Sequence, residues 1–252
     1  MHHKPNITQE EKLTRMTESP LPGLIFSLAV PTIVSMLISA LYNMADTYFV
    51  GLIGNASATG AIGVVFPLMS LMQAIAFMFG HGSGNHMSRS LGAGDVADAE
   101  KYASTGFFSA LGAGVLLMMI GLVWTDPIVR LLGATETIAP YARDYARYLM
   151  PGTPFMIAGF VLNNQLRFQG SAFYGMIGIT TGTILNILLD PIFIFVLDMQ
   201  VAGAAIATSI GQAVSFAVLL LMTSRAGNIP IKPRRFCLNA ETAKEIFRGG
   251  VP

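Results

Sequence analysis

The sequence predicts an all-α protein that crosses a membrane several times, because it is very apolar and its charges are unevenly spread. Of its 252 residues, 53% are hydrophobic and 12% are charged, and the mean hydropathy is +0.59. A soluble globular domain carries about 25% charged residues. The charges leave six long uncharged runs, and a membrane-spanning helix needs about 20 apolar residues. The runs lie at 21–45, 47–88, 102–125, 148–166, 168–189 and 199–224.

Six membrane-spanning helices follow from these runs. We expect them at roughly 24–46, 60–84, 103–125, 148–166, 172–197 and 201–224. The segment before the first span is polar and has no signal-peptide pattern, so the first helix is expected to stay as an anchor. The chain then divides into a cytoplasmic N-terminal tail at 1–22, a six-helix lobe at 23–225 and a cytoplasmic linker at 226–252.

The basic residues predict the orientation, because cytoplasmic loops of membrane proteins carry an excess of Lys and Arg. With the N-terminus inside, the outer segments hold only Arg130, Arg143 and Arg147. The inner segments hold Lys4, Lys12, Arg15, Arg89, Lys101, Arg167, Arg225, Lys232, Arg234, Arg235, Lys244 and Arg248. We therefore expect a multi-pass protein of the plasma (bacterial inner) membrane with both ends cytoplasmic. The net charge of +1 indicates no nucleic-acid partner.

Other kinds of chemistry find little support in the sequence. The single Cys237 excludes a disulfide framework and a cysteine-based metal site. His81 and His86, five residues apart, do not share a helix face well. The GHGSG stretch at 80–84 has no separate partner base, and glycines there more often let membrane helices approach closely. GAGDVA follows no predicted strand and lacks the third glycine of a dinucleotide site. We expect neither an enzyme nor a cofactor.

Two acids, Asp46 and Asp190, fall inside predicted spans. A carboxylate at the middle of a bilayer costs roughly 2.5–3.5 kcal/mol on insertion scales. Burial disfavours the charged form, so such a group can exchange a proton near neutral pH. The same group can instead face a pocket that holds a cation. The alternative for each acid is a structural role, in which it is hydrogen-bonded between helices.

Polar neighbours favour a shared site for the two acids. Asn186 and Asp190 are four residues apart, as are Tyr42 and Asp46, so each pair shares a helix face. The last two predicted spans fold about a turn near 199, with Asp190 nine residues before it and Thr208 nine after. Each should then lie about 13 Å below the turn. Such a group of oxygen ligands suits a proton or a hard cation such as Na⁺.

Four prolines are predicted to interrupt the spans, namely Pro31, Pro67, Pro154 and Pro191. Each removes a backbone hydrogen bond and frees a carbonyl group. Broken helices are common where transporters bind ions. Ordinary kinking suffices for Pro67 and Pro154. Pro191 follows one acid directly and Pro31 shares a helix with the other, so we expect these two to act as functional bends.

The sequence resembles the first half of a bacterial multidrug and toxic compound extrusion (MATE) transporter. The resemblance covers essentially the whole chain and is most specific in AVPTIVSMLISALYNMADTYFVG at 29–51, LGAGD at 91–95 and NILLDPIFIF at 186–195. It implies a twelve-helix fold of two six-helix lobes around a central cavity, of which this chain is the N-terminal lobe. It also implies antiport, the export of organic, often cationic, drugs in exchange for H⁺ or Na⁺.

The resemblance extends to a cation site in the N-terminal lobe. It implies that the ligands are Asp46, Asn186, Asp190 and Thr208, with Tyr42 nearby and Ala204 contributing a carbonyl. It also matches Pro31 to a proline where the first helix is proposed to bend on protonation. The chain departs from the family pattern at GGVP, 249–252, where a seventh helix would begin. A second six-helix lobe is therefore the expected partner, and two-lobe alternating access is not available to this chain alone.

Two other functions remain open at this point. A lipid-linked oligosaccharide flippase of the same superfamily would need basic residues in its cavity, whereas these spans carry acids and only Arg167 lies near a span end. A non-transporting membrane scaffold would bind no cation at the two acids. An intramembrane enzyme lacks a nucleophile–base pair.

Overall fold

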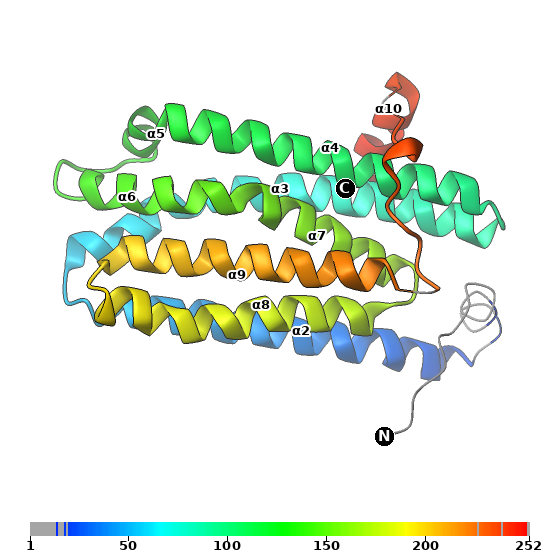
Figure 1. Cartoon of the computed structure of the whole chain (residues 1–252), viewed down its shortest axis with the longest axis horizontal. Helices are drawn as coiled ribbons and strands as arrows, with labels where there is room; N and C mark the ends of the chain where they lie inside the picture. The colour runs from blue at the N-terminus through cyan, green and yellow to red at the C-terminus, as the bar shows by residue number, and fades with distance from the viewer. Residues whose placement is uncertain (1–13, 15–17, 19, 226, 238, 251–252) are drawn as a thin grey trace.

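Long helices run side by side through the structure (Figure 1), a computed structural model that describes residues 14, 18, 20–225, 227–237 and 239–250. The predicted all-α fold is confirmed, and no strand occurs in that part of the chain. The long helices are α2 (Leu21–Gly51), α3 (Ala56–Gly92), α4 (Val96–Val123), α7 (Thr153–Phe168), α8 (Ala172–Pro191) and α9 (Gln200–Thr223). The shorter ones are α5 (Thr125–Leu131), α6 (Ala139–Leu149), η1 (Met150–Gly152), η2 (Ile192–Val196), η3 (Pro233–Arg235) and α10 (Ala240–Gly250). Most of the predicted N-terminal tail, including Lys4, Lys12 and Arg15, lies outside the described residues.

In the part of the chain that the structure describes, five helical segments are long and apolar enough to cross a membrane. They are Pro22–Gly51, Ala56–Gly92, Val96–Val123, Ala172–Val196 and Gln200–Thr223. The fourth predicted span, 148–166, differs: it begins in α6, passes through the 3-10 turn η1 and continues in α7, which has 16 residues. The prediction that Pro154 interrupts a helix is therefore wrong. Pro154 lies in the first turn of α7, where a backbone N–H would have no hydrogen-bond partner within the helix, so its absence costs nothing.

The turns between helices follow from local chemistry. Asn55 ends the first turn and caps α3, since its Oδ1 accepts hydrogen bonds from the backbone N–H groups of Ser57 and Ala58. In the LGAGD segment, Gly94 has φ +77°, and Asp95 accepts a hydrogen bond from the N–H of Asp98 at the start of α4. Gly94 therefore follows the C-terminal end of α3 and Asp95 is the N-cap of α4, positions that glycine and aspartate respectively favour.

The helix that carries Asp190 changes its form directly after the acid. Pro191 is the last residue of α8, and the π-helix η2 follows. A π-helix is rare and usually accommodates one extra residue within a helix. The chain then turns through Asp198 and Gln200, with φ of 52° and 51°, and α9 begins. Asp198 thus lies in the turn between η2 and α9, at the end of a span.

Small residues let the helices around Asp190 approach closely. α8 packs mainly against α9, and α2 lies along α8 rather than along α3, its neighbour in sequence (Figure 1). A Cβ added to Gly182 of α8 would lie 2.4 Å from the carbonyl oxygen of Gly211 in α9. A Cβ added to Gly211 would lie 2.9 Å from the oxygen of Gly182. The two backbones are therefore in direct contact, as in other membrane helix pairs with small residues at the interface.

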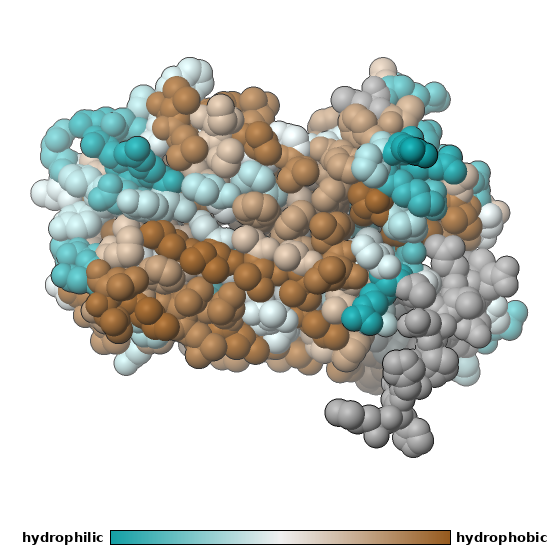
Figure 2. Space-filling view, in the orientation of Figure 1, coloured by the Kyte–Doolittle hydropathy of each residue, from teal (hydrophilic) through white to brown (hydrophobic). Residues whose placement is uncertain are grey.

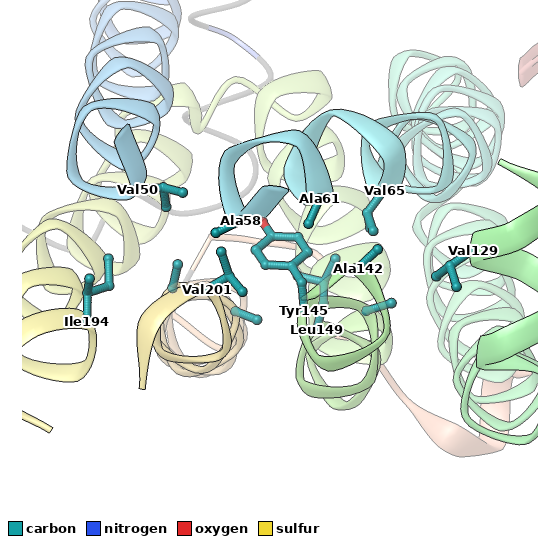
Figure 3. Packing of buried hydrophobic residues seen from close by; sticks show 13 residues of the cluster. Val50, Ala58, Ala61, Val65, Val129, Ala142, Tyr145, Leu149, Ile194 and Val201 are labelled. Atoms are coloured by element: carbon teal, nitrogen blue, oxygen red, sulfur yellow. The ribbon is translucent and has the colours of Figure 1, made fainter. Parts of the chain in front are cut away.

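An apolar cluster, which we call the outer cluster, joins the helix ends nearest the α8–α9 turn (Figure 3). Its buried members are Val50, Ala58, Ala61, Val65, Val129, Ala142, Tyr145, Ala146, Leu149, Ile194, Val201, Ala204 and Ala205. They come from α2, α3, α5, α6, η2 and α9. This cluster fixes the depth at which α2, α8 and α9 meet.

The surface suits a lipid environment. Figure 2 shows a broad hydrophobic band across the helices, with hydrophilic residues gathered toward the two ends of the bundle. Helix α2 exposes large side chains along its length, among them Phe26, Leu37, Leu41 and Met44. An apolar surface of this extent on a soluble protein would promote association, whereas lipid accommodates it.

Gly182→Ala is expected to separate α8 from α9, because the new methyl group would collide with the Gly211 carbonyl. Overpacking of this kind costs about 1–3 kcal/mol. We expect a lower thermal unfolding temperature for the purified protein in detergent. Gly63→Ala is the matched control, since Gly63 also lies inside a long helix but has no atom within 4 Å of its added Cβ. Equal unfolding temperatures for the two variants would contradict a close α8–α9 contact.

Candidate functional site

Three helices contribute the polar residues of the candidate site. We call Tyr42 and Asp46 of α2, Asn186 and Asp190 of α8, and Thr208 of α9 the acid site. Asp46, Asn186, Asp190 and Thr208 are buried, and Tyr42 is half-buried. The four-residue spacing on α2 and on α8 places each pair on one helix face, and the α8–α9 contact brings the third helix against them.

The hydroxyl group of Thr208 is the hydrogen-bonding centre of the acid site. Asn186 Nδ2 donates to Thr208 Oγ1 over 3.2 Å. The Tyr42 hydroxyl lies 3.3 Å from the same oxygen, and either hydroxyl can donate. One side chain of α9 therefore links α2 to α8. The depth count from the sequence placed Thr208 level with Asp190, but this hydrogen bond joins it to Asn186, one helical turn away.

The two acids are buried with little compensation. Asp190 is 0% exposed and Asp46 is 8% exposed. Both carboxyl oxygens of Asp190, Oδ1 of Asp46 and Oδ1 of Asn186 are buried and accept no hydrogen bond from the described residues. The two acids lie close enough for their charges to interact. Burying a carboxylate without a partner is unfavourable, and two neighbouring carboxylates repel each other. A proton or a small cation between these oxygens would remove both penalties.

The oxygen atoms set limits on what the acid site can hold. Carboxylate, amide and hydroxyl oxygens are ligands for hard cations. In the described part of the chain, no group of three or more His, Cys, Asp and Glu side chains is arranged to hold a metal ion. Two carboxyl groups supply enough charge for one or two protons or for a monovalent cation. The arrangement is therefore chemically suited to H⁺ or Na⁺.

The other residues predicted for the site lie around it. Ala204 lies one turn before Thr208 on α9 and is fully buried in the outer cluster. Pro191 directly follows Asp190, at the change from α8 to η2. Pro31 lies inside α2, which continues as one helix on both sides of it. The roles of these three residues as a carbonyl ligand and as bends stay predictions.

Sequence reasoning missed Tyr145. This residue of α6 is buried, and its ring lies between α6 and the α3 residues Ala58 and Ala61 (Figure 3). Its hydroxyl group is close enough to Tyr42, Asp46 and Asp190 for electrostatic interaction. The available signal was the amphipathic pattern of α6, whose buried face repeats at Ala142, Tyr145 and Leu149. That pattern shows which face of α6 is buried, but it does not show which residues of other helices this face contacts.

Comparison with known proteins agrees with this architecture. The MatE family model matches residues 31–192. The chain is 32% identical over 251 residues to the multidrug export protein MepA of Staphylococcus haemolyticus (strain JCSC1435), and 29% identical over 247 residues to MepA of Staphylococcus aureus (strain MRSA252). Each alignment covers 97% of this chain and 54% of the relative. The chain thus spans about half the length of the curated relatives it matches.

Solved structures show the same relation. A multidrug resistance MATE family transporter in an outward-facing conformation superimposes with a TM-score of 0.85 at 29% identity, over 99% of this chain and 54% of that one. A MOP superfamily transporter from Pyrococcus furiosus superimposes with a TM-score of 0.86 at 30% identity, over 99% of this chain and 54% of that one. The described helices therefore have the arrangement of one half of these transporters.

Thr208→Val is expected to weaken the link between α2, α8 and α9, because it keeps the side-chain shape but leaves the Asn186 amide and the Tyr42 hydroxyl without their partner. Polar contacts between membrane helices contribute about 0.6–1.7 kcal/mol. We expect a lower unfolding temperature in detergent, restored by Thr208→Ser. Thr181→Val is the control, because that exposed hydroxyl bonds only to the Ile177 carbonyl of its own helix. A Thr208→Val protein as stable as the control would contradict the link.

Proposed function

The chain belongs to the MatE family, and on that premise we propose that it forms the N-terminal lobe of a multidrug exporter driven by an inward gradient of H⁺ or Na⁺. The relatives of known name are multidrug export proteins about twice its length. A second six-helix lobe is the proposed partner, and the substrate cavity would lie between the two. The protein would act as a secondary antiporter in the bacterial plasma membrane, not as an enzyme.

The observation that carries this proposal is the pair of buried acids with unpartnered oxygens. Among the described residues, none donates a hydrogen bond to either carboxyl oxygen of Asp190 or to Oδ1 of Asp46. A purely structural acid in a membrane protein is normally satisfied by neighbouring donors. The acid site has instead four acceptor oxygens turned away from any donor in the described chain. We propose that H⁺ or Na⁺ binds among these oxygens, held by Asp46, Asp190 and Asn186.

We propose that cation binding changes the position of α2 relative to α8. This helix packs mainly on α8 and exposes most of its length, so few apolar contacts hold it in place. The contact of Tyr42 with Thr208 and the repulsion between Asp46 and Asp190 therefore have a large share in determining where α2 lies. A cation that neutralises Asp46 and Asp190 removes their repulsion and draws α2 toward α8. The bend at Pro31 would transmit this change along α2 and release the drug outward.

The proposed cargo is a small organic molecule, often cationic. Asp46 and Asp190 are the two carboxyl groups buried in the described α2–α8–α9 face, and carboxylates attract organic cations and repel anions. Arg167 lies near the end of α7, away from the acid site. The drug and the coupling ion would then compete for the same negative charge, and this competition would couple drug export to the inward movement of H⁺ or Na⁺.

The intact exporter should lose transport when either acid is neutralised. Asp46→Asn and Asp190→Asn each remove one negative charge while keeping the side-chain size. We expect a loss of drug efflux of about tenfold or more, because a charge-dependent coupling energy is typically 1–3 kcal/mol. The measurement is efflux of a fluorescent organic cation from proteoliposomes under an imposed H⁺ or Na⁺ gradient. Asp144→Asn, an exposed acid of α6, is the matched control.

The same assay separates the two coupling ions. Applying each gradient alone shows which of them supports efflux by the wild-type protein. The proposal fails if both Asn variants transport like wild type under the gradient that the wild type uses. Far-ultraviolet circular dichroism of both variants checks that a loss of efflux does not come from unfolding.

A further inference from the structure

The segment after α9 forms a strap across α4. We use the term strap for residues 231–237, which include η3. The backbone N–H of Lys232 donates to Ser104 Oγ over 3.0 Å, and the N–H of Cys237 donates to Thr105 Oγ1 over 3.2 Å. Ser104 and Thr105 lie near the start of the uncharged run of α4 at 102–125. The strap therefore lies at the level where α4 enters the hydrocarbon region.

The strap carries more positive charge than its surroundings neutralise. Lys232 Nζ lies 2.6 Å from Glu100 Oε1, and Arg235 Nε lies 3.3 Å from Glu100 Oε2. One carboxylate thus serves two cations, and η3 adds the exposed Arg234. Figure 2 shows hydrophilic surface in the region of η3, bordered by hydrophobic surface. We therefore expect the surplus charge to lie near the level of the lipid headgroups.

An apolar pocket opens directly below these cations. Phe236 of the strap packs edge-on against Phe108, one helical turn deeper than Ser104, with ring centroids 5.9 Å apart. The pocket has a volume of about 370 Å³ and continues down to Gly112, a further turn away. Phe79 and Phe247 complete its aromatic wall. Its one unpartnered polar atom is the buried Ser109 Oγ.

Helix α10 forms the far wall of the pocket and is firmly docked. A Cβ on Gly82 of α3 would lie 2.0 Å from the carbonyl oxygen of Ile246 in α10, so the two backbones touch. The Tyr102 hydroxyl of α4 donates a hydrogen bond to the Glu245 carboxylate of α10. Tyr102 in turn stacks on His86 of α3, with centroids 4.8 Å apart. The pocket is thus a fixed feature of the lobe and not a gap beside a loose segment.

We propose that the strap and this pocket bind an anionic phospholipid, with its phosphate on Arg234 and Arg235 and one acyl chain in the pocket. Arg235 directly precedes Phe236, which lines the pocket, and the pocket extends from Phe108 to Gly112, one to two helical turns, or about 5–11 Å, below Ser104. This span matches the step from headgroup to hydrocarbon. The volume is within the range of ligand pockets. The cationic rim disfavours organic cations, so the site is distinct from the proposed drug path. It does not depend on the acid site.

The test is lipid binding to the delipidated intact protein by native mass spectrometry. Phosphatidylglycerol and phosphatidylcholine with identical acyl chains are the probes. We expect tight binding of one phosphatidylglycerol and weaker binding of phosphatidylcholine. The double variant Arg234→Gln/Arg235→Gln should bind phosphatidylglycerol about 30-fold more weakly, since each surface cation contributes about one factor of five. Lys232 still pairs with Glu100 in this variant, so the strap should stay in place.

Gly112→Leu tests the pocket separately from the charges. No atom lies within 4 Å of a Cβ added to Gly112, so the new side chain can enter the pocket without a clash and displace an acyl chain. We expect the tight phosphatidylglycerol to be lost in this variant. Gly63→Leu is the control for replacing a glycine by leucine, since a Cβ added at Gly63 likewise has no atom within 4 Å. Arg130→Gln is the control for charge, because Arg130 is likewise paired with one acid, Glu136.

Three results would overturn the proposal. The first is equal binding of the two lipids by the wild-type protein. The second is phosphatidylglycerol binding at wild-type affinity by the double Gln variant. The third is unchanged lipid binding by Gly112→Leu together with a lower unfolding temperature, which would mean that protein from elsewhere in the intact transporter fills the pocket.

Discussion

The backbone contact between α8 and α9 determines where the acid site lies. At Gly182 and Gly211 the two helices approach so closely that neither position has room for a methyl group. The same contact brings the Cβ of Asn186 against α9, within 3.0 Å of where a Cβ on Gly211 would be. Thr208 then lies within hydrogen-bonding distance of Asn186, and Tyr42 can reach both helices through one hydroxyl group. The polar arrangement is therefore a consequence of apolar packing by the smallest residues.

Much of this arrangement could be predicted from the sequence, because helix geometry is regular. The four-residue spacing on α8 and the turn near 199 were sufficient to bring Asn186, Asp190 and Thr208 to one region, whereas the choice of Asp46 as their partner rested on the family resemblance. The rotation of each helix about its axis depends on tertiary contacts, so the partner of Thr208 could not be predicted. Tyr145 was missed for the same reason. Hydropathy also treated 148–166 as one span, although Pro151 and Gly152 form the 3-10 turn η1 within it.

Both ends of the lobe have an apolar cluster, but they differ in how many polar contacts are added to it. Near the α8–α9 turn, the outer cluster packs small aliphatic side chains and one tyrosine. At the opposite end, an apolar cluster that includes Ile246 of α10 is supplemented by hydrogen bonds, ion pairs and a glycine contact, among them Lys232–Glu100 and Tyr102–Glu245. Apolar packing keeps the depth of the acid site fixed. Charged contacts hold the strap where the lobe meets lipid headgroups and water.

The placement of α2 beside α8 has a consequence for the order in which the protein is made. The Asn186–Thr208 hydrogen bond joins residues 22 positions apart, whereas the Tyr42–Thr208 bond joins residues 166 positions apart. At a synthesis rate of 5–20 residues per second, Tyr42 is synthesised roughly 10–30 s before Thr208. During that interval Asp46 must be accommodated by lipid, water or the insertion machinery. Asp46 thus enters the membrane well before the other residues of the acid site on α8 and α9 have been synthesised.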